Sequence, residues 1–175
     1  MLPLKFSCAI ITAQEKNKVN KVKMYREYLN GRIGALIYIT GTLVRGFSTQ
    51  TFAEENYGIT PDQYVILFLL VENKEIMYQR QLSEILFKDR SNISRIIEIM
   101  QKNGLIEKFP DSNGRKIYKL IVTEKGRQIK DKIFPKDICM RKEITKDITP
   151  EELAITFKTL EKMNTNIRNK VKLQI

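Results

Sequence analysis

Apolar residues recur at steps of three and four along most of this 175-residue chain, and this spacing indicates amphipathic helices. The first such stretch runs from Met24 to about Thr51, and its apolar positions are Ile33, Leu36, Ile37, Val44 and Phe47. A second helix begins at Thr60-Pro61-Asp62-Gln63, which combines an N-cap, a first-turn proline and a capping box. Residues 64–71 are almost all apolar, so this helix is expected at the centre of the core.

Two shorter helices follow, and together they predict a helix-turn-helix. The first spans residues 78–87, and its expected core positions are Leu82, Ile85 and Leu86. The second begins near Asp89 or Ser91, and its inward positions are Ile93, Ile96, Ile97 and Met100. Gly104 then supplies a left-handed stop, after which Leu105 can reach back to Met100.

A hairpin and two further helices complete the predicted elements. Residues 105–109 and 115–122 have the composition of strands, and Asn113-Gly114 between them is a tight-turn signal. Thr123 caps a helix from Glu124 to about Lys136, where Pro135 predicts a bend, and residues 149–152 cap a last helix. The expected fold class is mainly α: a winged helix-turn-helix with a small β-hairpin wing and with further N- and C-terminal helices.

Charge favours a polyanionic partner, because the chain carries a net +11 with a pI near 9.6. Residues 79–127 hold eleven basic and six acidic side chains, whereas residues 24–78 hold four and six. The positive excess therefore includes the helix-turn-helix and hairpin. Residues 1–23 are also basic, and they are either a flexible extension or the product of a start codon upstream of a native start at Met24.

Composition argues against several other classes. The chain contains no histidine, which removes the commonest base and metal ligand, and no nucleotide-binding glycine motif occurs. We therefore expect no enzyme activity, no cofactor and no metal. Two cysteines, Cys8 and Cys139, suit a reducing cytoplasm. The apolar block 33–44 lies between Arg32 and Arg45 and is too short to span a membrane.

The polar face of the helix that begins near residue 89 carries the side chains that read base edges. If its aliphatic residues point inward, Ser91, Asn92, Ser94 and Arg95 point outward. Arginine recognises guanine, asparagine adenine and serine either base. The predicted partner is double-stranded DNA, and the expected contacts are Arg80, Arg90, Ser91, Asn92, Ser94 and Arg95, with Arg115, Lys116 and Lys119 from the hairpin.

Structural explanations for the same residues remain open. Ser91 and Asn92 could act only as helix caps, and Arg95 could pair with Glu98 or Asp89 on a solvated face. Cations at the hairpin tip also protect an edge strand against aggregation.

The order of these motifs resembles the MarR family of winged-helix transcriptional regulators over residues 60–126. The matching residues are Gln81-Leu82, Leu86, Ser91-Asn92-Ile93-Ser94-Arg95, Asn103-Gly104-Leu105-Ile106 and Val122-Thr123-Glu124-Lys125-Gly126. In the wing, Gly114 stands where the family has an aspartate and Lys116 where it has an arginine, although Asp111 or a shifted turn could substitute. Residues 24–51 contain no cysteine, which argues against the redox-sensing branch, and the lack of histidine argues against the zinc-responsive branch.

The resemblance implies a homodimer that binds a pseudo-palindromic operator, usually as a repressor, and that releases DNA on binding a small, often anionic aromatic effector. Tyr38, Phe47, Tyr57 and Tyr64 could line an effector pocket, although aromatic residues on helices are more often core. The expected parts are a basic extension (1–23), a dimerisation helix and linker (24–59), a DNA-binding domain (60–123) and C-terminal dimerisation helices (124–175). The competing interpretation is a winged helix that packs DNA non-specifically or binds another protein.

Overall fold

The computed structural model describes residues 27–73, 76–110, 118–168 and 170–171. These residues fall in two compact units, which divide between Gly46 and Phe47, within helix α2 (Ile33–Glu54). Gly31 adopts a left-handed conformation, with φ of 72°, just before α2 begins. The continuous helix predicted from Met24 is therefore wrong at this point, because glycine enters this conformation without steric cost and the exposed residues beside it provide no packing against it.

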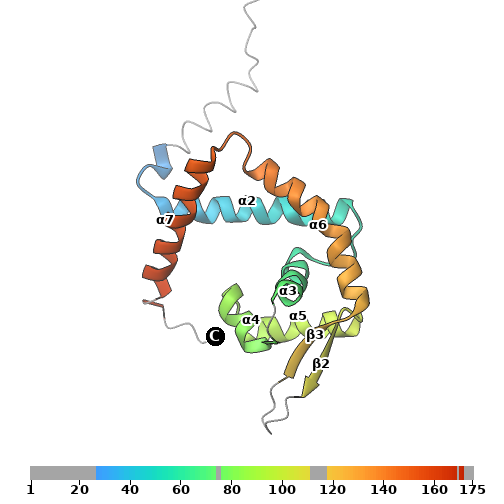
Figure 1. The fold of residues 1–175 in the computed structure, drawn as a ribbon. Helices are drawn as coiled ribbons and strands as arrows, with labels where there is room; N and C mark the ends of the chain where they lie inside the picture. The colour runs from blue at the N-terminus through green and yellow to red at the C-terminus, as the bar shows by residue number, and fades with distance from the viewer. Residues whose placement is uncertain (1–26, 74–75, 111–117, 169, 172–175) are drawn as a thin grey trace, which may run out of the picture. The chain divides into compact units, whose positions relative to one another are not determined.

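Helix α3 (Pro61–Glu72) follows a short loop and supplies much of the core of the second unit (Figure 1). The predicted capping box is confirmed: the Gln63 side chain accepts a hydrogen bond from the Thr60 backbone N–H at 2.9 Å. In return, Thr60 Oγ1 accepts one from the Gln63 backbone N–H at 3.3 Å. Ile66 and Leu67 are fully buried, which agrees with the predicted central position of this helix.

Helices α4 (Gln79–Leu86) and α5 (Arg90–Lys102) form the predicted helix-turn-helix. Phe87 turns the chain between them in a left-handed conformation, with φ of 51°. The end of α5 is the expected Schellman motif: Gly104 has φ of 69°, and the Leu105 N–H donates to the Met100 carbonyl at 2.9 Å. Leu105 and Met100 are both buried, so the polar and apolar parts of this motif are both present.

Three antiparallel strands form one small sheet in the order β1-β3-β2. Strands β2 (Ile106–Pro110) and β3 (Tyr118–Val122) form the predicted wing, and the register pairs Ile106 with Val122. The predicted turn at Asn113-Gly114 lies outside the described residues. Strand β1 (Met77–Tyr78) pairs with β3, and its second residue, Tyr78, was predicted to begin a helix.

The core of the second unit agrees with most predicted inward positions. Ile93, Ile97 and Met100 are fully buried on α5, and Leu82 is fully buried on α4. Three positions differ, because Leu86 and Ile96 are half-buried and Ile85 is 48% exposed. Helix α4 therefore buries fewer apolar side chains than the spacing predicts. With only eight residues, it buries just the side that contacts neighbouring elements.

Helix α6 (Glu124–Ile144) continues well beyond the predicted end near Lys136, with Pro135 inside it. A proline removes one helical hydrogen bond, but Ile133 and Met140 are buried on either side of it and hold the helix together. Thr149 and Glu152 then form the predicted cap of α7 (Pro150–Arg168), with hydrogen bonds of 2.8 and 3.2 Å. No helix within the described ranges has the length and apolar character needed to cross a membrane.

Candidate nucleic-acid interface

One side of α5 packs into the core while the other side carries polar residues. Asp89 caps the helix, since its Oδ1 atom accepts a hydrogen bond from the Asn92 backbone N–H at 2.7 Å. Ser91 is therefore not the N-cap of α5, which was the structural explanation considered for this residue. Arg90, Ser91, Asn92 and Arg95 are exposed, and Ser94 is half-buried. Among the described residues no carboxylate forms an ion pair with Arg95, so its guanidinium is available to a ligand.

The turn before α5 is fixed to the rest of the domain by an ion pair. Lys88 Nζ lies 3.0 Å from Asp62 Oδ2, at the start of α3, and the Lys88 side chain is largely buried. The two residues are 26 positions apart in sequence, and the sequence alone did not predict that they would pair. This contact holds the N-terminal end of α5 in place, and Lys88 serves the fold.

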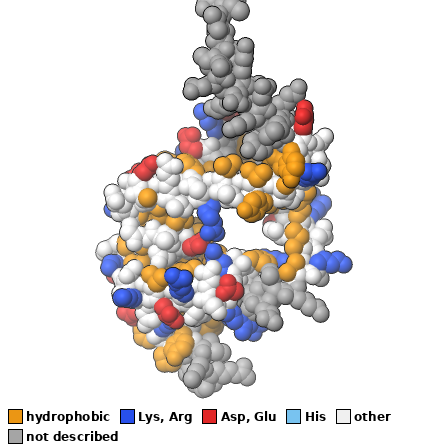
Figure 2. Space-filling view, turned by 180° about the vertical axis from the view of Figure 1, so that it is seen from behind, with side chains coloured by type: hydrophobic (Ala, Val, Ile, Leu, Met, Phe, Trp, Pro, Cys, Tyr) orange, Lys and Arg blue, Asp and Glu red, His pale blue; other side chains and the backbone are white. Residues whose placement is uncertain are grey.

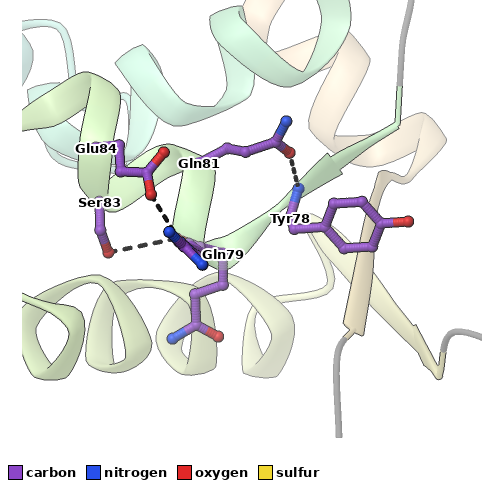
Figure 3. A network of polar contacts seen from close by, with 6 residues as sticks. Tyr78, Gln79, Gln81, Ser83 and Glu84 are labelled. Carbon is purple, nitrogen blue, oxygen red and sulfur yellow. Dashed lines mark hydrogen bonds and ion pairs between the residues drawn. The ribbon is translucent and has the colours of Figure 1, made fainter. Parts of the chain in front are cut away.

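Arg80 lies in the first turn of α4, where Figure 3 shows the polar contacts that organise this helix start. The Gln81 side chain accepts from the Tyr78 backbone N–H at 2.8 Å, and Ser83 Oγ donates to the Gln79 carbonyl at 3.4 Å. Arg80 Nε lies 2.7 Å from Glu84 Oε1, and the Arg80 side chain is 74% exposed. An exposed pair of this kind contributes only about 0–1 kcal/mol, so a phosphate can displace Glu84 as the partner.

The wing places Lys119 beside two aromatic residues. The register pairs Lys119 with Phe109 on β2 and with Tyr78 on β1, so all three side chains lie on the same face of the sheet. Lys119 is half-buried and Phe109 is 44% exposed. Arg115 and Lys116, the other cations expected in the wing, lie outside the described residues.

The C-terminal end of α5 is attached to the N-terminal end of α6. Thr123 Oγ1 donates to the Gly104 carbonyl at 2.7 Å, and the Thr123 N–H donates to the Leu105 carbonyl at 3.1 Å. Lys125 Nζ donates to the Asn103 carbonyl at 2.8 Å. Three successive carbonyl groups after α5 are thus bound by the first residues of α6. Gly126 allows this approach, since a Cβ atom there would lie 2.3 Å from the Leu105 carbonyl oxygen.

Two of the four aromatic residues expected to bind an effector lie in one cluster. Phe52 contacts both Tyr57 and Tyr64, with ring centroids 5.3 and 5.7 Å apart. Tyr64 is buried, and its hydroxyl has no hydrogen-bond partner among the described residues. Burial, with the nearby Asp137 charge as a smaller cause, raises the pKa of Tyr64 to about 12. Tyr38 and Phe47 are exposed on α2, 75% and 39% respectively.

A buried lysine beside this aromatic cluster was not predicted from the sequence. Lys130 on α6 is 8% exposed and lies 2.9 Å from Glu72 at the end of α3. Its ammonium group also lies 5.9 and 5.3 Å from the ring centroids of Phe68 and Phe134. The hydrogen bond to Glu72 is the main reason that the pKa of Lys130 is raised. Lys130 is therefore charged and paired, and it joins α6 to α3.

An open cleft of about 560 Å³ lies between the end of α2, the start of α3 and the C-terminal half of α5. It is lined by apolar and amide side chains that include Phe52, Ile59, Gln63, Ile99 and Asn103. None of the four predicted effector residues lines it. Within the described residues, no cluster of acidic and cysteine side chains is arranged to hold a metal ion.

Comparison with known proteins identifies relatives of one kind. A family model described as MarR family matches residues 57–117. From Bacillus subtilis (strain 168), the uncharacterized HTH-type transcriptional regulator YsmB is 30% identical over 114 residues, which are 65% of this chain and 77% of YsmB. The uncharacterized HTH-type transcriptional regulator YybA, from the same strain, is 36% identical over 75 residues, 43% of this chain and only 49% of YybA.

A solved structure extends the comparison to three dimensions. It contains a MarR family protein from Listeria monocytogenes complexed with 26mer DNA, and it is 30% identical to this chain with a TM-score of 0.68. The superposition covers 77% of this chain and 87% of that chain. The winged helix-turn-helix fold expected from the sequence is thereby confirmed.

Proposed function

This chain belongs to the MarR family of transcriptional regulators, and we propose that it represses transcription as a homodimer bound to a pseudo-palindromic operator in double-stranded DNA. We further propose that it acts in the cytoplasm and that a small anionic or aromatic effector releases it from the operator. A two-fold dimer would place the two α5 helices about 34 Å apart, one turn of duplex.

The polar side of α5 carries this proposal. Ser91, Asn92 and Arg95 are exposed on one side, while Ile93 and Ile97 on the other side are fully buried and fix the orientation of the helix. These exposed side chains offer the donors and acceptors that read bases in a major groove. The relative from Listeria monocytogenes was crystallised with DNA, which supports the same partner here.

The remaining cations would hold the duplex backbone. Arg80 and Arg90 lie near the N-terminal ends of α4 and α5, where free backbone N–H groups also favour phosphate. Lys119 extends from the wing sheet, and Arg115 and Lys116 are assigned to the wing by sequence alone. Such contacts set the position of the protein on DNA and carry little sequence information.

Uncovered apolar side chains support the proposed homodimer. No residue of α7 is buried, and Ile155, Phe157 and Ile167 are each more than half exposed. On α2, Ile33 and Leu43 are similarly exposed, and a Cβ atom at Gly34 or Gly41 would meet nothing within 4 Å. Figure 2 shows hydrophobic side chains at the surface of both helices. A second copy of the chain would cover these faces.

The proposed effector has two candidate locations in the second unit. One is the aromatic cluster with Tyr57 and Tyr64, where the buried hydroxyl of Tyr64 could bind a polar ligand group. The other is the cleft beside Ile99 and Asn103, which touches α5 directly. An effector at either place would release DNA only if it bound more tightly to the protein conformation that does not bind DNA than to the one that does. Neither Tyr38 nor Phe47 is among the residues that form these two locations.

The proposal is tested by selecting bound fragments from the source genome and then measuring affinity for the selected site and for random DNA. A sequence-specific regulator should bind its site about 10³-fold or more tightly than random DNA. Measurements at several salt concentrations separate base recognition from phosphate attraction. Equal affinity for all sequences would favour the competing function, non-specific DNA packing, which the net charge of +11 also suits.

A further inference from the structure

The exposed side of α5 includes an acidic residue at a place where a DNA-binding surface is expected to be basic. Glu98 is the one acidic residue between Arg90 and Lys102, and it is exposed. It lies one turn beyond Arg95 and two turns beyond Ser91, so all three share the outward side of the helix. Glu98 therefore lies at the C-terminal edge of the surface that the proposed function assigns to base recognition.

A hydrogen bond within the helix holds this carboxylate. Ser94 Oγ donates to Glu98 Oε1 at 3.3 Å. Among the described residues no lysine or arginine forms an ion pair with Glu98, although Arg95 and Lys102 are on the same side of the helix. Ser94 is half-buried, and its hydroxyl faces Glu98 because it donates this hydrogen bond. The carboxylate is thus positioned by a neutral neighbour, Ser94.

A negative charge in a major groove is unfavourable near phosphates unless the carboxylate meets a hydrogen-bond donor. Guanine and thymine present acceptors there, which repel a carboxylate, whereas cytosine presents its N4 amino group as a donor. Adenine presents an amino group beside the N7 acceptor, so it is the poorer partner. The rise from Arg95 to Glu98 is about 4.5 Å, more than the 3.4 Å between base pairs, so the two side chains reach different base pairs.

We propose that Glu98 determines part of the sequence specificity, by accepting a hydrogen bond from the N4 amino group of a cytosine in each half of the operator, and that Ser94 positions Glu98 for this contact. The inference rests on the proposed function, since it requires α5 to lie in the major groove. It gives Ser94 a role through Glu98, in place of the direct base contact expected from the sequence.

The test compares the full-length protein with Glu98→Ala, Glu98→Gln and Ser94→Ala variants on the selected operator and on every single-base-pair change of it. Glu143→Gln, an exposed acid on α6, is the control for loss of one negative charge. Glu98→Ala should bind random DNA several-fold more tightly, because a charge that repels phosphate is removed. It should also lose on the order of tenfold discrimination at one C·G pair in each half-site.

The other variants separate the two roles. Glu98→Gln, which can donate as well as accept, should shift the preference at the same pair toward adenine. Ser94→Ala should weaken discrimination at that same pair, while Glu143→Gln should leave every preference unchanged. If Glu98→Ala discriminates among base pairs as well as the unsubstituted protein does, the inference is wrong. It is also wrong if this variant loses discrimination only at positions of adenine. Either result would leave the proposed function intact. Unsubstituted protein that prefers no sequence would overturn both.

Discussion

Replacement of Gly126 by alanine should separate the end of α5 from the start of α6. The added Cβ atom would lie 2.3 Å from the Leu105 carbonyl oxygen and 2.7 Å from Val122 Cγ1. The first contact is with backbone, so no rotation of a side chain relieves it. The first turn of α6 must therefore move away, and inserting one carbon into a packed site costs about 1–3 kcal/mol.

The displacement also strains the hydrogen bonds that cross this junction. Thr123 donates to the Gly104 and Leu105 carbonyls at 2.7 and 3.1 Å, and each such bond contributes about 0.5–1.5 kcal/mol. Loss of one or both gives a total decrease in the free energy of unfolding of roughly 1.5–6 kcal/mol. For a chain of 175 residues this corresponds to a decrease in Tm of roughly 3–24 °C.

Thermal unfolding followed by far-ultraviolet circular dichroism measures this effect. All variants are compared at one protein concentration, because the stability of a dimer depends on concentration. Gln128→Ala is the control, since Gln128 is exposed on the same helix and bonds only to Glu124 in the part of the chain that the structure describes. If Gly126→Ala unfolds within about 1 °C of this control, the close approach of α6 to Leu105 does not exist in solution.

Four further substitutions test DNA recognition, dimerisation and the Lys130 ion pair. Arg95→Ala should lose about 1–3 kcal/mol of base discrimination, whereas Lys116→Ala should weaken binding to all sequences and flatten its salt dependence, as measured by equilibrium titration. Phe157→Glu should shift the sedimentation coefficient toward that of a monomer, because the charge would be buried in the proposed dimer interface. Lys130→Met should make the decrease in stability above about pH 10.5, the unfolded-state pKa, smaller, because a raised folded-state pKa stabilises the protein only while lysine is protonated. The raised pKa of Tyr64 would still cause part of the decrease in this variant.

Local signals made most of the second unit predictable from sequence. The capping box of Thr60 and Gln63 and the Schellman motif at Gly104 each depend on residues within about six positions of one another. The inward side of α5 follows from the spacing of Ile93, Ile97 and Met100, which a helix converts directly into one face. Such local interactions do not depend on the rest of the chain, so they form in the folded structure as the sequence predicts.

Contacts between distant residues account for what the sequence analysis missed. Strand β1 exists because Met77 and Tyr78 pair with β3, some 40 positions later, and two residues alone carry no strand signal. Lys130 meets Glu72 across 58 positions, so nothing local indicates that this lysine is buried. Gly126 was selected only as part of a motif, and the backbone approach that requires it is visible only in the structure.

Contacts with neighbouring helices hold α5 at both of its ends. Lys88 fixes the turn before α5 to the start of α3, and Thr123 and Lys125 fix its last residues to α6. Lys130 then joins α6 to the other end of α3 through Glu72. The three helices are thus linked pairwise and should move as one body. An effector that displaced α6 would have to displace α5 with it, so it could change the spacing of two α5 helices in a dimer without altering the reading surface of either.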